Sequence, residues 1–153
     1  MKHIMGILFS LLLIGLASCD HCNNLDCLSS NYHGHFRIVS KADNKDLVFG
    51  PASIYDKDSI KFFSLKNSDT TFYETKAMRF PSTRYDDSIL FVNFLPGTAT
   101  AFVQFNNGDT DTLTMTYSSR DTRCCGMIVD IDNFKFNNST DLGGNGETRE
   151  IRK

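Results

Sequence analysis

Residues 112–117 read Thr-Leu-Thr-Met-Thr-Tyr, so apolar and polar side chains alternate along this stretch. Successive side chains of a β-strand point to opposite faces of the sheet. Leu113, Met115 and Tyr117 therefore fall on one face and the threonines on the other. This pattern predicts a half-buried antiparallel strand and sets the fold class of the chain.

Segments of similar character flank this stretch on both sides. Residues 89–95 are apolar at every position except Asn93, and Pro96-Gly97 follows them, which predicts a strand covered on both faces. β-branched and aromatic residues between short turn signals predict further strands. These strands are expected at residues 34–40, 46–50, 59–65, 72–78, 100–105 and 127–136.

The turn after Phe105 fixes how two of these strands pair. A two-residue turn at Asn107 and Gly108 would place Val103 opposite Thr112. A loop of about five residues would place Val103 opposite Leu113 and gather more apolar side chains on one face. We therefore predict the longer loop.

Seven or eight short strands without a convincing amphipathic helix predict an all-β fold. The favoured architecture is an antiparallel β-sandwich over residues 34–136, immunoglobulin-like or similar, and a small open β-barrel is the alternative. Residues 137–153 are rich in Asn, Gly, Thr and charge. We predict a flexible polar tail there, because such a composition buries too little apolar surface to order the chain.

The length and charge of the chain limit its function classes. With 153 residues, the chain is long enough for one modest domain. Its formal net charge is -2, with 16 Lys and Arg against 18 Asp and Glu. A protein that neutralises nucleic-acid phosphates carries a basic surface, so nucleic acid is not an expected partner.

The N-terminal segment has the layout of an export signal. Lys2 and His3 precede an apolar run from Ile4 to Leu16. This run is too short for a transmembrane helix, which needs roughly 20 residues. A basic start followed by a short apolar run is typical of a secretory signal, and we assign residues 1–18 to it.

The signal ends in Leu16-Ala17-Ser18-Cys19, which resembles the lipobox of bacterial lipoproteins. The resemblance implies cleavage between Ser18 and Cys19 and attachment of a diacylglycerol to the Cys19 thiol, followed by further fatty acylation such as palmitate. Two or more acyl chains make a stable membrane anchor. Residues 19–33 would then form a tether with two further cysteines. An ordinary secretory signal with an incidental Cys19 is the alternative.

The other four cysteines are expected to pair, because exported proteins fold in an oxidising compartment. They are Cys22, Cys27, Cys124 and Cys125. Adjacent Cα atoms lie about 3.8 Å apart, below the usual span of a disulfide, so a bridge between Cys124 and Cys125 is disfavoured. Each N-terminal cysteine is therefore predicted to join one of the adjacent pair.

A small envelope enzyme or a metal-binding module is the alternative function. Its ligands would be His21, His33 and His35 together with the thiols. The cysteine spacing does not match a zinc site, and the sequence contains none of the common hydrolase, phosphate-loop or metalloprotease motifs. We therefore expect no catalytic residues, no metal ion and no cofactor. The sequence favours a protein that is not an enzyme without deciding the point.

A wider resemblance covers most of the chain. Its segments are the lipobox and residues 36–39, 46–50, 109–113, 117 and 124–126. Together they resemble the small lipoproteins of Bacteroidota that have no assigned activity. The resemblance implies a lipid-anchored protein of the bacterial cell envelope with a β domain. We expect this domain to face the periplasm. The anchor and the lack of catalytic motifs favour a domain that binds or scaffolds a partner. The expected partners are the membrane, through the lipid on Cys19, and an envelope protein or glycan.

Overall fold

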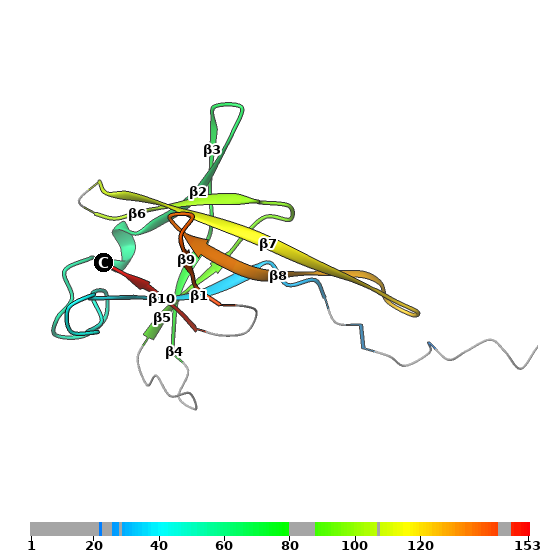
Figure 1. Cartoon of the computed structure of the whole chain (residues 1–153), viewed down its shortest axis with the longest axis horizontal. Helices are drawn as coiled ribbons and strands as arrows, with labels where there is room; N and C mark the ends of the chain where they lie inside the picture. Colours follow the sequence, from blue (N-terminus) through cyan, green and yellow to red (C-terminus); the bar gives the residue numbers. More distant parts are fainter. Residues whose placement is uncertain (1–21, 23–25, 28, 80–87, 107, 144–147) are drawn as a thin grey trace, which may run out of the picture. The chain divides into compact units, whose positions relative to one another are not determined.

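The protein is an all-β structure whose strands form two sheets (Figure 1). The computed structural model describes residues 22, 26–27, 29–79, 88–106, 108–143 and 148–153. Over these residues the two sheets do not close into a barrel. The predicted β-sandwich is therefore confirmed, and the barrel alternative is not what forms.

One sheet has four strands and the other has six. The first contains, in spatial order, β10 (Thr148–Arg152), β1 (His33–Val39), β5 (Ser88–Asn93) and β4 (Thr75–Arg79). The second contains β3 (Asp69–Phe72), β2 (Lys61–Lys66), β6 (Thr100–Gln104), β7 (Thr110–Thr122), β8 (Gly126–Phe136) and β9 (Thr140–Asp141). A short 3-10 helix, η1 (Lys57–Ser59), precedes β2.

The chain divides into two compact units. The smaller comprises Met1–Ser29 with Asp121–Ile128, and the larger comprises Ser30–Arg120 with Val129–Lys153. The larger unit holds the hydrophobic core. Its strands alternate inward and outward side chains as the sequence pattern requires, so that Leu113 and Met115 of β7 are buried as predicted.

Phe36 of β1 joins the two sheets at the centre of this core. Its ring is fully buried and stacks on Phe62 of β2, with 5.4 Å between the ring centroids. It also meets Phe134 of β8 edge-on at 5.3 Å. Stacked and edge-on arrangements are the favourable geometries for aromatic pairs, so these rings add specificity to the area they bury.

The pairing of β6 with β7 differs from the prediction by two residues. Val103 lies opposite Asp111, and Ala101 lies opposite Leu113. The N–H of Phe105 donates to the carbonyl of Asp109 at 2.9 Å, so the loop spans three residues rather than about five. Gly108 has φ +81°, which suits a three-residue hairpin loop with a left-handed residue. A shift of two residues keeps the predicted faces.

The predicted flexible tail at 137–153 is wrong. Residues 148–152 form β10, which pairs in parallel with β1, and residues 140–141 form β9 beside β8. Ile151 is fully buried, and the Arg149 guanidinium lies 4.4 Å from the Phe134 ring centroid. The composition of the whole segment concealed a five-residue strand that covers the edge of β1. This parallel pair also means that the sandwich is not wholly antiparallel.

Two predicted strands are also corrected. Residues 46–50 form a turn because the Asp46 carboxylate accepts hydrogen bonds from the N–H groups of Val48 and Phe49, at 2.8 and 2.7 Å. The predicted strand at 72–78 is interrupted after Phe72, where β3 ends, and a new strand begins at Thr75. The break lies where the chain moves from one sheet to the other.

Candidate ligand-binding site

The four predicted cysteines form two disulfides in the smaller unit. Cys22 bonds to Cys124 and Cys27 bonds to Cys125, with Cα atoms 5.3 and 5.4 Å apart. The predicted pattern, in which each N-terminal cysteine joins one of the adjacent pair, is confirmed. The first bond to form closes a loop of about 100 residues and is worth roughly 4 to 5 kcal/mol in the chain-entropy model.

The turn that presents the adjacent cysteines is built around Thr122. Its hydroxyl donates to the carbonyl of Gly126 at 2.9 Å and accepts from the N–H of Cys125 at 3.0 Å. Gly126 adopts φ +68°, a conformation in which glycine carries little steric cost. These contacts close the turn between β7 and β8, so both sulfurs are held in a short, defined segment.

The residues assigned to lipidation and cleavage lie outside the described residues. They are Ser18 and Cys19, together with the rest of residues 1–18; His21 is outside them as well. Within the described ranges, the structure contains no helix that is long and apolar enough to cross a membrane.

The two described histidines of the alternative site lie next to each other on β1. The rings of His33 and His35 are 5.1 Å apart, and both contact the ring of Phe91 on β5. Burial and then the positive charge of Arg149 lower the pKa of His33. Burial, followed by His33 and Arg149, lowers the pKa of His35. Both rings are therefore mainly neutral at pH 7.

The thiols of the alternative site are not available as metal ligands, because all four belong to disulfides. Thiolates, not disulfide sulfurs, are the usual zinc ligands. Among the residues that the structure describes, no three His, Cys, Asp or Glu side chains come together in a group that could hold a metal ion.

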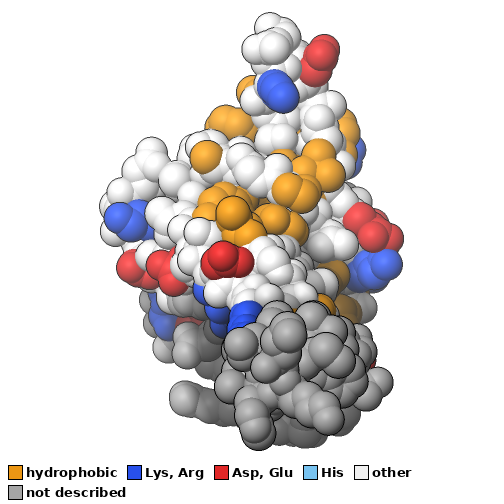
Figure 2. All heavy atoms as spheres, turned by 90° about the vertical axis from the view of Figure 1, so that its right-hand side faces the viewer, with side chains coloured by type: hydrophobic (Ala, Val, Ile, Leu, Met, Phe, Trp, Pro, Cys, Tyr) orange, Lys and Arg blue, Asp and Glu red, His pale blue; other side chains and the backbone are white. Residues whose placement is uncertain are grey.

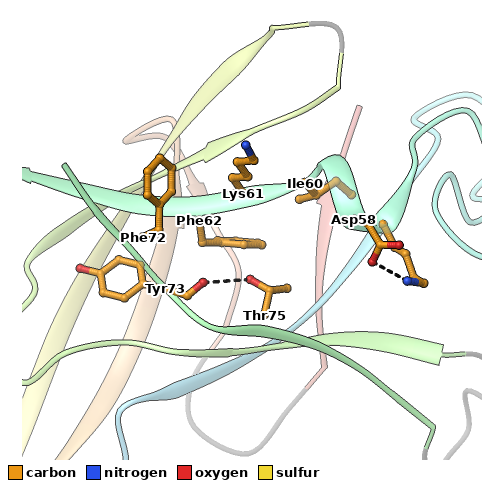
Figure 3. Close-up of a pocket in the computed structure, with 8 residues that line it drawn as sticks. Asp58, Ile60, Lys61, Phe62, Phe72, Tyr73 and Thr75 are labelled. Carbon is orange, nitrogen blue, oxygen red and sulfur yellow. Dashed lines mark hydrogen bonds and ion pairs between the residues drawn. The ribbon is translucent and has the colours of Figure 1, made fainter.

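A pocket lies where the chain crosses between the sheets. The N–H of Tyr73 still donates to Phe62 of β2 at 2.8 Å, while the carbonyl of Glu74 already accepts from Asn93, at the end of β5, at 3.3 Å. Because β3 ends at Phe72, it does not cover the start of β2 in the six-stranded sheet. The resulting pocket, between β2 and the β3–β4 segment, has a volume of about 310 Å³ (Figure 3).

One part of the pocket lining is apolar and aromatic. Figure 3 shows Ile60 and Phe62 along its middle, with Phe72 and Tyr73 at one end. Phe62 is fully buried, whereas Phe72 is 60% exposed to solvent. The pocket therefore runs from the edge of the core to a ring that is open to solvent.

The rest of the lining is polar. Lys57 forms an ion pair with Asp58 at one end, and the Thr75 hydroxyl donates to the Tyr73 carbonyl at 3.5 Å. Lys61 places its ammonium 5.8 Å from the centre of the Phe72 ring. Mixed apolar and polar groups of this kind are typical of pockets that orient a small ligand.

Phe72 also ends a row of aromatic rings on the six-stranded sheet. It lies opposite Phe63 of β2, which lies opposite Phe102 of β6. The ring centroids are 5.7 and 5.3 Å apart along this row. Since the neighbouring Phe62 points into the core, this row lies on the outer face of the sheet. The contacts with Phe63 support the exposed Phe72 ring from one side.

A second pocket, of about 430 Å³, lies between the β2–β3 hairpin and residues 95–100. Leu65 and Leu95 line it and are about half exposed, at 54% and 53%. Figure 2 shows hydrophobic side chains gathered on this face below the projecting hairpin. Tyr73 links the two pockets, because its hydroxyl is hydrogen-bonded to the Thr98 hydroxyl at 3.0 Å.

The sequence did not point to the residues of the first pocket. The sequence pattern predicts one continuous strand at 72–78, which would place Tyr73 on the opposite face from Phe72 within that strand. The available signal was the pair of aromatic doublets, Phe62-Phe63 and Phe72-Tyr73. A doublet puts large rings on both faces of a strand, which predicts that the outer face carries exposed aromatic surface.

Fold and site together define a disulfide-bonded β-sandwich protein with an open, partly aromatic pocket at the edge of its sheets. No protein-family model matches the chain, and searches of the curated proteins and of the solved structures give no match.

Proposed function

We propose that this protein is a lipid-anchored protein of the bacterial cell envelope whose β-sandwich acts as a binding domain. The observation that carries the proposal is the pair of disulfides next to the lipobox-like segment. Structural disulfides persist in oxidising compartments outside the cytoplasm, which agrees with the export signal read from residues 1–18.

The arrangement suits a tethered domain. Cys22 follows the proposed lipid-bearing Cys19 by three positions, and its disulfide joins the anchored segment to Cys124. A pull on the lipid would therefore reach residue 124 through covalent bonds without first extending the whole N-terminal segment. Cys27 and Cys125 supply a second connection of the same kind.

Binding, rather than catalysis, is supported by the character of the first pocket. It offers an exposed ring, lysine ammonium groups and hydroxyls, which position a ligand. The thiols of the alternative metal-dependent function are committed to disulfides, so that function has no specific observation in its favour.

A Cys19→Ser variant of the full chain tests the proposal. In the bacterial host, the unaltered chain should sediment with membranes and resist extraction by high salt, and the variant should move to the soluble envelope fraction. A Cys22→Ser variant is the matched control, since it removes a cysteine from the same segment but leaves the lipobox-like residues unchanged. Equal membrane retention of the Cys19→Ser variant would contradict the proposed anchor.

A further inference from the structure

The pocket beside Phe72 combines an open aromatic face with a positive charge. Phe72 is 60% exposed, although the residues before and after it in the chain are both paired with β2: Thr71 lies opposite Ser64, and the N–H of Tyr73 donates to the carbonyl of Phe62. Its ring contacts Phe63 on one side, at 5.7 Å between centroids. An exposed ring held in this way offers a flat apolar surface for stacking at a small conformational cost.

The charges of the lining favour an anionic ligand. Lys57 is paired with Asp58, so these two largely offset each other. Lys61 has no carboxylate partner among the residues that the structure describes, and its ammonium lies near the Phe72 ring. The pocket is therefore locally positive in a chain whose net charge is -2. Opposite charge placed beside a stacking surface gives both orientation and affinity.

The polarity of the lining favours a carbohydrate over a purely apolar ligand. A sugar ring has an apolar face of C–H groups and a rim of hydroxyls. The Phe72 ring matches the apolar face, while the Asp58 carboxylate and the Thr75 hydroxyl can accept hydrogen bonds from a hydroxyl rim. The volume of about 310 Å³ lies at the small end of ligand pockets, which suits one or two sugar rings of a longer chain.

We propose that the pocket between β2 and the β3–β4 segment binds an acidic oligosaccharide, with one sugar ring stacked on Phe72 and its carboxylate paired with Lys61. The inference rests on the proposed binding function and names the ligand class for that site. Asp58 and Thr75 accept hydrogen bonds from hydroxyls of the same chain of sugars.

Two oligosaccharides of matched geometry test the proposal by isothermal titration calorimetry. The acidic probe is the tetramer of β-1,4-linked mannuronic acid, and the neutral probe is the tetramer of β-1,4-linked mannose. The full chain, purified in detergent micelles, should bind the acidic tetramer with a Kd of about 1 mM or tighter, and the neutral tetramer about fivefold more weakly. The affinity for the acidic tetramer should fall as the salt concentration rises.

Variants separate the two parts of the site. Phe72→Ala should weaken both tetramers by about tenfold, because it removes the stacking surface. Lys61→Gln should weaken the acidic tetramer by about fivefold and leave the neutral one unchanged. Lys66→Gln and Leu65→Ala are the matched controls, since both residues lie on β2 outside this pocket, and they should change affinity by less than about twofold.

The proposal is overturned if the acidic tetramer gives no saturable heat, if both tetramers bind equally well, or if Phe72→Ala and Lys61→Gln bind like the controls. Unchanged thermal unfolding of each variant shows that a loss of binding is local. These outcomes are independent of membrane retention. If the acidic tetramer does not bind, the proposed lipid anchor is unaffected. If the chain is not retained by membranes but still binds the acidic tetramer, the proposed anchor alone is refuted.

Discussion

Gly34 occupies a position on β1 that has no room for a side chain. A Cβ atom there would lie 2.5 and 2.6 Å from two ring carbons of Phe36 and 3.1 Å from the ring of Phe134. Both rings are fully buried and cannot move aside. Gly34→Ala should therefore lower the free energy of unfolding by about 2 to 3 kcal/mol, as measured by urea denaturation.

Gly97→Ala is the control for this substitution. Gly97 has open space around it but adopts φ +77°, so alanine there should cost about 1 kcal/mol from backbone strain alone. If Gly34→Ala were no more destabilising than Gly97→Ala, the close packing assigned to Phe36 would be wrong.

Asp46 is a buried carboxylate with two tasks. One oxygen lies 3.0 Å from Nε of Arg37, and the other accepts the N–H groups of Val48 and Phe49. Asp46→Ala should cost about 3 to 5 kcal/mol, because it removes the charge that pairs with Arg37 and the oxygen that accepts both backbone N–H groups. Asp46→Asn keeps an acceptor oxygen and should cost less.

Chemical denaturation at pH 7 measures both variants. Asp43→Ala serves as the control, since Asp43 pairs with Lys45 at an exposed position and its loss should leave the free energy of unfolding nearly unchanged. A cost for Asp46→Ala as small as that of the control would show that the ion pair with Arg37 does not support the 46–50 turn.

Tyr117 should make the stability of the folded protein depend on pH in the alkaline range. Burial, and then the nearby Tyr73 and Tyr32, raise the pKa of Tyr117 to about 12. In the unfolded chain a tyrosine loses its proton near pH 10. Between about pH 10 and pH 12 the unfolded chain therefore binds fewer protons than the folded one, so stability should fall as pH rises through this window.

Thermal unfolding across this pH range, together with ultraviolet absorbance of tyrosinate, measures the effect. Tyr117→Phe also removes the hydrogen bond from the hydroxyl to the Thr98 carbonyl, at 2.6 Å, and should be less stable at neutral pH. Its decline in stability above pH 10 should be shallower than that of the unaltered chain. An identical decline in both proteins would exclude Tyr117 as its source.

At the level of elements, β10 is the strand that composition concealed. The composition of residues 137–153 predicts one polar segment, yet Ile151 is fully buried beside Ile38 of β1 in the register of the sheet. Ile151→Ala should cost about 2 to 4 kcal/mol, as expected for a large core residue. The same substitution in a solvated tail would leave the free energy of unfolding nearly unchanged.

Arg152→Ala is the matched control on the same strand. Arg152 is exposed and forms an ion pair with Glu150, so its loss should cost less than about 1 kcal/mol in the same urea denaturation. Equal and small effects of Ile151→Ala and Arg152→Ala would mean that β10 is not part of the cooperative fold.

Alternation of polar and apolar residues predicted most strands of the core, and the reasons for the failures are local. Leu113 and Met115 are buried as their period-two pattern required. Residues 46–50 have a strand-like composition, but the Asp46 side chain captures two backbone N–H groups and bends the chain. Such a local side-chain hydrogen bond is not visible in an apolar pattern.

The hairpin between β6 and β7 shows what the pattern does and does not determine. Burial selects which residues share a face, so the predicted partnership of Ala101 and Val103 with the inner face of β7 is correct. A shift by two residues preserves the faces, and the choice between such registers lies in the loop geometry at Gly108.

At the level of the whole molecule, covalent features were easier to predict than the pocket. The disulfide pattern follows from the short distance between adjacent Cα atoms, and Cys22–Cys124 with Cys27–Cys125 confirm it. The pocket depends on where the chain crosses between the sheets, at Tyr73. That crossing is a tertiary event, so the sequence pattern of a single strand could not locate it.

Mass spectrometry of the N-terminal peptide, from the chain purified out of membranes, decides whether the protein is lipid-anchored. We expect a peptide that begins at Cys19, carries a diacylglycerol on that residue, and is joined to the peptide of Cys124 and Cys125 until a reductant is added. A peptide in which Cys19 is unmodified, or one that retains residues 1–18, would contradict the claim that this is a lipid-anchored envelope protein.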